Sequence, residues 1–149
     1  CTVSTELPKV CDWCEARRPT SPRAKPAPTR HRLRAPPAIQ RGPAKYAYIS
    51  EKWEFPGGKM EAEETEEQTI IREIREELDM QIEVKAKLLT VEHNYPDFHL
   101  TMHAYLCETK QSEPTLTEHI DFKWLSLAGL GVLDWAGADV PVVVALINR

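Results

Sequence analysis

One amphipathic, strongly acidic segment constrains the fold of this chain more than any other feature. In TEEQTIIREIREEL, residues 65–78, the apolar side chains Ile70, Ile74 and Leu78 recur at i, i+4 and i+8. Thr65 and the glutamine three residues later have the spacing of a capping box, which marks a helix start. The segment is therefore predicted to be a helix that buries one apolar face against the rest of a globular domain.

The opposite face of this predicted helix carries three closely spaced carboxylates. Glu73, Glu76 and Glu77 are separated by i+3 and i+4, so their side chains are predicted to converge. Convergent carboxylates suit a hard cation such as Mg²⁺ or Mn²⁺, and magnesium commonly pairs protein carboxylates with substrate phosphates. The spacing alone leaves two interpretations open, a metal site and a solvated acidic surface.

A glycine pair lies just upstream, in WEFPGGKME. Gly57 and Gly58 permit backbone conformations and close approaches that a side chain would prevent, and Pro56 stiffens the entry to the turn. A glycine pair is weak evidence by itself. Followed by a carboxylate-bearing helix, it predicts a loop that presents backbone groups to a cation and a phosphate.

These elements together resemble the Nudix box, GX5EX7REUXEEXGU. Gly58 is followed after five residues by Glu64 and after seven more by REIREELDM, and the one departure is Asp79, which stands where the pattern has glycine. The similarity continues from about residue 40 to the C-terminus, through WEFPGGK, YPDFHL, EHIDFKWLSL and ADVP, and is strongest to the MutT-like branch. The resemblance implies an α/β fold, a Nudix-type α/β/α sandwich with a mixed β-sheet.

The resemblance also implies an activity. Members of this branch hydrolyse nucleoside triphosphates to monophosphates and pyrophosphate with Mg²⁺ or Mn²⁺, and the 8-oxo-dGTP diphosphatase type acts in sanitation of the nucleotide pool. A pyrophosphohydrolase for CTP or dCTP and a catalytically impaired nucleotide-binding domain are the alternatives. The implied partner is a nucleoside triphosphate, with no membrane, no nucleic acid, and a monomeric or homodimeric state.

Site residues follow from the positions that match the family pattern. The resemblance implies metal ligands or catalytic groups at Gly57 (through its carbonyl), Glu73, Glu76, Glu77 and Glu118. Either Glu77 or Glu118 would take the proton of the attacking water. Glu64 and Arg72 match positions that organise the loop and the helix.

Substrate contacts are implied for a further group of residues, namely Arg41, Phe55, Gly58, Lys59, Asp97, Phe98 and Asp139. Phe98 has core packing as its alternative role, and Asp139 has helix capping. MutT proper carries Asn at the position of Asp139. Ionised Asp offers only hydrogen-bond acceptors, which favours cytosine nucleotides as an alternative to 8-oxoguanine.

Other segments have the patterns of strands and of a closing helix. Residues 81–93 and 98–108 are predicted strands, the second alternating apolar and polar side chains, and 121–127 is a shorter one. Residues 137–149 are predicted to form a helix with Pro141 in its first turn. Cys107 is expected in the core, and His93, His99 and His103 are expected to be strand residues rather than ligands.

The first 38 residues differ from the rest of the chain. They contain seven of the twelve prolines, and residues 1–45 hold ten Lys and Arg against three Asp and Glu. No strand or helix period is visible, so the segment is predicted to be disordered or altered by a shift of reading frame, and the Nudix domain to span 39–149. The CDWC motif has no second ligand pair, so no zinc site is predicted. Without a visible signal peptide or apolar span, a cytoplasmic location is the expectation.

Overall fold

The computed structural model describes residues 4–15, 37–111 and 113–149, with residues 4–15 described by their main chain. The elements follow in the order β1 (Ser4–Glu15), β2 (Ala38–Gln40), β3 (Trp53–Glu54), α1 (Glu66–Leu78), β4 (Glu83–Asn94), β5 (His99–Thr109), β6 (Asp121–Lys123), the 3₁₀ helix η1 (Leu127–Val132) and α2 (Val140–Ile147).

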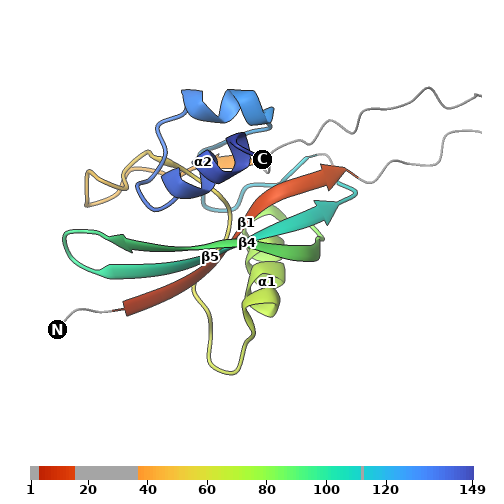
Figure 1. Cartoon of the computed structure of the whole chain (residues 1–149), viewed down its shortest axis with the longest axis horizontal. Coiled ribbons are helices and arrows are strands. Elements are labelled where there is room, and N and C mark those ends of the chain that lie inside the picture. Colours follow the sequence, from red (N-terminus) through yellow and green to blue (C-terminus); the bar gives the residue numbers. More distant parts are fainter. Residues whose placement is uncertain (1–3, 16–36, 112) are drawn as a thin grey trace, which may run out of the picture.

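The central layer is a mixed sheet with the strand order β1-β5-β4. Strands β4 and β5 form an antiparallel hairpin, and β1 pairs with β5 in parallel. A second small sheet has the order β3-β2-β6, with antiparallel pairing on both sides of β2. Helix α1 covers one face of the larger sheet, and α2 lies with η1 on the other side (Figure 1). The mixed α/β sandwich expected from the sequence is confirmed.

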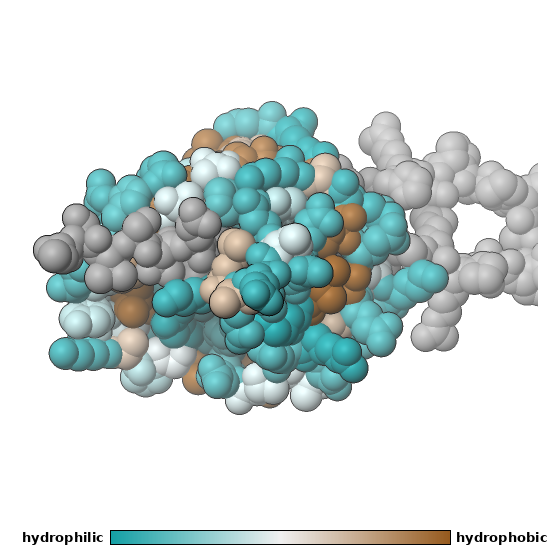
Figure 2. All heavy atoms as spheres, turned by 90° about the horizontal axis from the view of Figure 1, so that it is seen from below, coloured by the Kyte–Doolittle hydropathy of each residue, from teal (hydrophilic) through white to brown (hydrophobic). Residues whose placement is uncertain are grey.

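Two apolar clusters fill the spaces on either side of this sheet. Leu100, Met102 and Ala104 of β5 pack in one cluster with residues of α2, including Val142 and Leu146. On the other face, residues of β5 and α1 form the second cluster with no exposed area at Ile70, Ile74 or Leu78. The face of the molecule on the α1 side is largely hydrophilic (Figure 2). The predicted amphipathic helix and the alternation in β5 are therefore both confirmed, as is Cys107 as a buried residue.

The ends of helix α1 follow the local sequence. Thr65 caps the N-terminus through its side chain, which accepts a hydrogen bond from the Gln68 N–H, while the Gln68 side chain accepts one from the Thr65 N–H. At the other end Asp79 adopts the left-handed conformation, with φ 51° and ψ 40°. Aspartate tolerates this conformation better than most residues with a side chain, so the box pattern ends normally without its glycine.

The N-terminal segment is where structure and sequence expectation differ. The sequence predicts disorder or a shifted reading frame for residues 1–38, whereas the main chain of Ser4–Glu15 forms a strand that pairs in parallel with β5, with a register shift between Val10 and Asp12. Pairing with a neighbouring strand satisfies main-chain groups whatever the side-chain pattern, so the sequence period did not reveal it. Residues 1–3 and 16–36 lie outside the described part, and the division at residue 38 and the altered reading frame stay predictions.

The remaining elements are shorter than predicted. Strand β6 covers only Asp121–Lys123, and α2 begins at Val140 with Pro141 in its first turn. Within the described residues no helix is long and apolar enough to cross a membrane. The cysteines of the CDWC motif fall in β1, where no side chain is described.

Candidate active site

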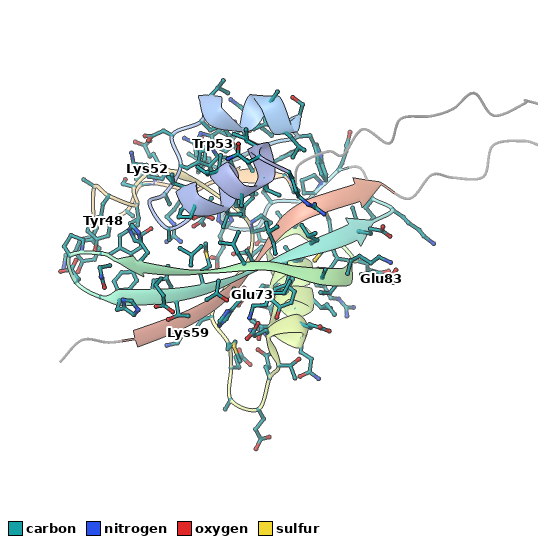
Figure 3. All side chains as sticks on the ribbon, in the orientation of Figure 1. Tyr48, Lys52, Trp53, Lys59, Glu73 and Glu83 are labelled. Atoms are coloured by element: carbon teal, nitrogen blue, oxygen red, sulfur yellow. The ribbon has the colours of Figure 1, made fainter. Side chains whose placement is uncertain are left out.

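The glycine loop before helix α1 meets two of the helix's glutamates. The Gly57 N–H donates a hydrogen bond of 3.2 Å to Glu77 Oε2, and Gly57 has φ 150°, a conformation that residues with a side chain rarely adopt. The Glu73 carboxylate lies directly over Gly58, in the space that a Cβ at that residue would need. The backbone conformation at residue 57 and the position of Glu73 over residue 58 therefore each call for glycine. Figure 3 shows Glu73 at helix α1.

The protein environment makes Glu77 a weaker acid than an ordinary glutamate side chain. Burial raises the pKa of Glu77 to about 7, and the negative charges of Glu54 and Glu73 act in the same direction. His119 and the Gly57 N–H act against this rise. Burial also raises the pKa of Glu73. Buried carboxylates that repel one another are stabilised by a cation, so Glu73, Glu77 and the Gly57 carbonyl have the chemistry that a divalent metal ion requires.

Arg72 lies among the acidic side chains between helix α1 and the glycine loop. Its Nε and Nη2 donate to Glu64 at 2.7 and 3.0 Å, and its Nη1 donates to Glu73 and Glu76 at 2.9 and 3.1 Å. Nη2 also donates to the Lys59 carbonyl, which connects the glycine loop to the helix. The bond from Arg72 is the main reason that the pKa of Glu64 falls to about 2.

The three glutamates do not all converge on one point, contrary to what their spacing predicted. Glu73 and Glu77 face the glycine loop, whereas Glu76 is 60% exposed and pairs with Arg72. Among residues 4–15, 37–111 and 113–149, no group of three or more acidic, histidine or cysteine side chains is arranged to hold a metal ion. The three carboxylates divide between two donors: Glu73 and Glu76 accept from Arg72 Nη1, whereas Glu77 accepts from the Gly57 N–H.

A cavity of about 310 Å³ connects these carboxylates to the remaining substrate candidates. Eight predicted site residues line it: Arg41, Gly57, Gly58, Lys59, Glu73, Glu77, Phe98 and Asp139. Six lining residues were not predicted: Ile49, Glu54, Tyr95, Leu100, Ala136 and Ala138. The volume is at the lower end of that typical for small-ligand sites.

Six predicted site residues lie outside this lining: Glu64, Arg72 and Glu76, whose contacts are given above, and Phe55, Asp97 and Glu118. Phe55 is fully buried and its ring stacks on Trp135, with centroids 4.5 Å apart. Asp97 accepts a hydrogen bond from the Tyr48 hydroxyl. Glu118 is exposed. Their predicted contacts with substrate or metal would require a different arrangement from this one.

Asp139 is held at the cavity by the strand that precedes the glycine loop. It is 1% exposed, and its Oδ1 accepts a 3.0 Å hydrogen bond from the Phe55 N–H. It occupies the N-cap position of α2, but its side chain makes no capping bond. The local sequence ADVP suggested a cap, and the long-range bond to β3 replaces it.

A partly buried polar network at the cavity includes two residues that the sequence did not indicate, Glu54 and His119. Glu54, 7% exposed, accepts hydrogen bonds from Arg41 Nη2 at 3.2 and 3.3 Å and pairs with His119 Nε2 at 3.0 Å. Arg41, Glu54 and His119 come from three separate segments, so no spacing in the sequence indicated that they meet. Glu54 thereby fixes the guanidinium of Arg41 at the rim of the cavity.

Comparison with known proteins agrees with this geometry. Residues 40–145 match the family model described as the NUDIX domain. The chain belongs to the Nudix hydrolase family. This Nudix hydrolase is similar to the 8-oxo-dGTP diphosphatase of Escherichia coli K12, with 37% identity over 100 residues, 67% of this chain and 78% of that protein.

Two further similarities support the MutT-like branch. The chain is 31% identical to the CTP pyrophosphohydrolase of E. coli K12 over 105 residues, 62% of this chain and 69% of that protein. Its structure is also similar to the solution structure of the DNA mismatch repair protein MutT of methicillin-resistant Staphylococcus aureus 252, with a TM-score of 0.65 and 30% identity. That likeness covers 99% of this chain and 98% of the other. The protein is therefore an enzyme of the MutT-like Nudix class.

Proposed function

We propose that this Nudix hydrolase converts a nucleoside triphosphate to a monophosphate and pyrophosphate with the help of Mg²⁺ or Mn²⁺, in sanitation of the nucleotide pool. One observation carries the proposal. A single cavity is lined by Glu73, Glu77 and the glycine loop and also by Phe98 and Asp139. The triphosphate would lie toward the carboxylates and the nucleobase toward Asp139.

Each lining residue has a part in the proposed reaction. Glu73 and the Gly57 carbonyl would hold the cation, with Glu77 beside them. The bound cation would neutralise charge on the phosphates that bare carboxylates would otherwise repel. Lys59 and Arg41 would contact phosphate oxygens, and Glu54 keeps the guanidinium of Arg41 in place.

Glu77 is our candidate for the group that accepts the proton of the attacking water. It lines the cavity, and its pKa of about 7 is close to the value that suits a general base near neutral pH. Glu118, the other candidate, is exposed and does not line the cavity. Water would attack phosphorus, pass its proton to Glu77, and pyrophosphate would leave.

A substrate panel tests this proposal. With Mg²⁺, the purified chain is expected to release pyrophosphate from at least one of 8-oxo-dGTP, dCTP and CTP, as measured by a coupled pyrophosphate assay. EDTA should stop the release, and added Mg²⁺ or Mn²⁺ should restore it. If nucleotides bind but no pyrophosphate appears with either metal, the alternative of a catalytically impaired nucleotide-binding domain is correct.

The chemistry of Asp139 favours a second candidate substrate, CTP or dCTP. A carboxylate accepts hydrogen bonds from the cytosine amino group, whereas an amide can both donate and accept. Asp139→Asn keeps an oxygen for the Phe55 N–H. We expect the substitution to shift the ratio of kcat/KM for 8-oxo-dGTP over dCTP upward by about tenfold. An unchanged ratio, with folding intact by circular dichroism, would show that Asp139 does not contact the base.

A further inference from the structure

The segment between β2 and β3 forms a loop that is held by hydrogen bonds among its own residues. The N–H groups of Ile49 and Ser50 donate to the Tyr46 carbonyl at 3.1 and 3.0 Å, and the Ala44 N–H donates to Ser50 Oγ at 2.9 Å. We call residues 42–51 the tyrosine loop. The loop reaches the substrate cavity through Ile49, which is part of its lining.

A stack of aromatic rings joins the tyrosine loop to the turn of the β4–β5 hairpin. Tyr46 stacks on Tyr48 with centroids 5.4 Å apart, and Tyr48 stacks on Tyr95 at 5.2 Å. Tyr95 in turn contacts Phe98 at 5.1 Å. Tyr48 lies at the hairpin end of the molecule (Figure 3). Stacked rings supply contact area but little preference for one position along the stack.

The Tyr48 hydroxyl adds a directional hydrogen bond to this contact between the loop and the hairpin. It donates a hydrogen bond to Oδ2 of Asp97. Asp97 lies between Tyr95 and Phe98 in the sequence, and both of these hairpin residues line the cavity. This bond is the main cause that raises the pKa of Tyr48 to about 12, so the hydroxyl remains a donor across the range in which the enzyme would work. The hairpin turn itself is closed by the Tyr95 N–H, which donates to the Phe98 carbonyl at 2.9 Å.

We infer that Tyr48 is a positioning residue for the nucleobase end of the cavity, and that Asp97 acts by holding Tyr48 rather than by touching the base. Ile49 of the tyrosine loop lines the same cavity as Tyr95 and Phe98 of the hairpin, and the bond from Tyr48 to Asp97 holds the loop to the hairpin, so the space available to a flat ring depends on it. The inference rests on the proposed function, because it assumes that a nucleobase enters this part of the cavity.

The test compares Tyr48→Phe with the wild type and with Tyr46→Phe on whichever triphosphate of the panel is turned over fastest. Tyr48→Phe keeps the ring stack and removes one hydrogen bond, so KM is expected to rise about fivefold with kcat changed less than about twofold. Tyr46→Phe removes a hydroxyl from the same stack and is expected to match the wild type. Equal KM values in all three proteins would overturn the inference.

Asp97 provides the second arm of the test. Asp97→Asn retains an oxygen that accepts from Tyr48 and is expected to keep KM within about twofold of wild type for each base, whereas Asp97→Ala should reproduce Tyr48→Phe. A base-dependent change of KM in Asp97→Asn would instead show direct contact with the base and overturn the assigned role.

Hydrogen exchange separates this inference from the proposed function. The amides of Ile49 and Ser50 are expected to exchange about fivefold faster in Tyr48→Phe than in wild type or Tyr46→Phe, without any substrate. If no triphosphate is hydrolysed, the proposed function fails while the exchange rates still decide whether Tyr48 holds the loop. Unchanged exchange in Tyr48→Phe would contradict the inference whatever the enzyme hydrolyses.

Discussion

Replacement of Glu77 by Gln is expected to reduce kcat by about 10³-fold on the preferred triphosphate. Glutamine keeps an oxygen for the Gly57 N–H, so the glycine loop should keep its place, but an amide cannot take a proton from water. Steady-state pyrophosphate release with Mg²⁺ measures the loss. Glu118→Gln is the matched control, because Glu118 is the other candidate base and is exposed.

The two variants give opposite outcomes for the two candidate bases. If Glu118→Gln shows the large loss and Glu77→Gln retains activity, the assignment of Glu77 is wrong and the cavity must rearrange to admit Glu118. If neither variant loses activity, the proposed site itself is contradicted.

The same replacement is expected to stabilise the protein at high pH in the absence of metal. The folded-state pKa of Glu77 is about 7, above its ordinary value of 4.5. Below pH 4.5 the carboxyl is protonated in both the folded and the unfolded state, and as pH rises through 7 its ionisation lowers the free energy of unfolding of the wild type. Gln does not ionise. The free energy of unfolding of Glu77→Gln should therefore exceed that of wild type by about 3 kcal/mol at pH 8 and by much less at pH 4. Urea unfolding in EDTA at the two pH values measures the difference.

Gly58→Ala is expected to lower kcat/KM by about 10²-fold while the fold persists. A Cβ at this position would lie 2.5 Å from Glu73 Oε2 and closer still to Cδ and Oε1, so the carboxylate must leave its place. Glu73 is a flexible side chain, but its move breaks the bond from Arg72 Nη1. The candidate metal ligand is thereby displaced.

Gly131→Ala is the matched control for this substitution. It lies in η1, and a Cβ there would meet nothing within 4 Å. Both variants should unfold within about 1 kcal/mol of wild type, as measured by urea titration. Equal activity of Gly58→Ala and Gly131→Ala would show that the position of Glu73 over the glycine loop has no part in catalysis.

Local patterns in the sequence were sufficient for the central helix and its ends. Thr65 and Gln68 are three residues apart, and both bonds of the capping box need only that spacing. The buried positions of Ile70, Ile74 and Leu78 likewise follow from a period that any α-helix imposes. The family pattern added the glycine pair, and most of the residues it implied line one cavity.

Contacts between distant segments could not be predicted in the same way. Strand β1 pairs with β5, almost 100 positions further along the chain, and no short-range spacing indicates such a parallel partner. Glu73 and Glu76 meet, as their spacing predicts, but they meet at Arg72 Nη1, and Glu64 holds that guanidinium in place. The sequence shows which charged residues are present, but it does not show which of them pair with one another.

The sequence by itself determined the helix with its carboxylates, the glycine loop beside it and the family to which the chain belongs, because each depends on residues near one another along the chain. Only the tertiary structure decided which carboxylates share a cavity, since Glu54 and His119 reach Glu77 from separate segments. It also decided that Asp97 meets Tyr48, because that bond joins residues 49 positions apart, one in the loop between β2 and β3 and the other in the turn of the β4–β5 hairpin.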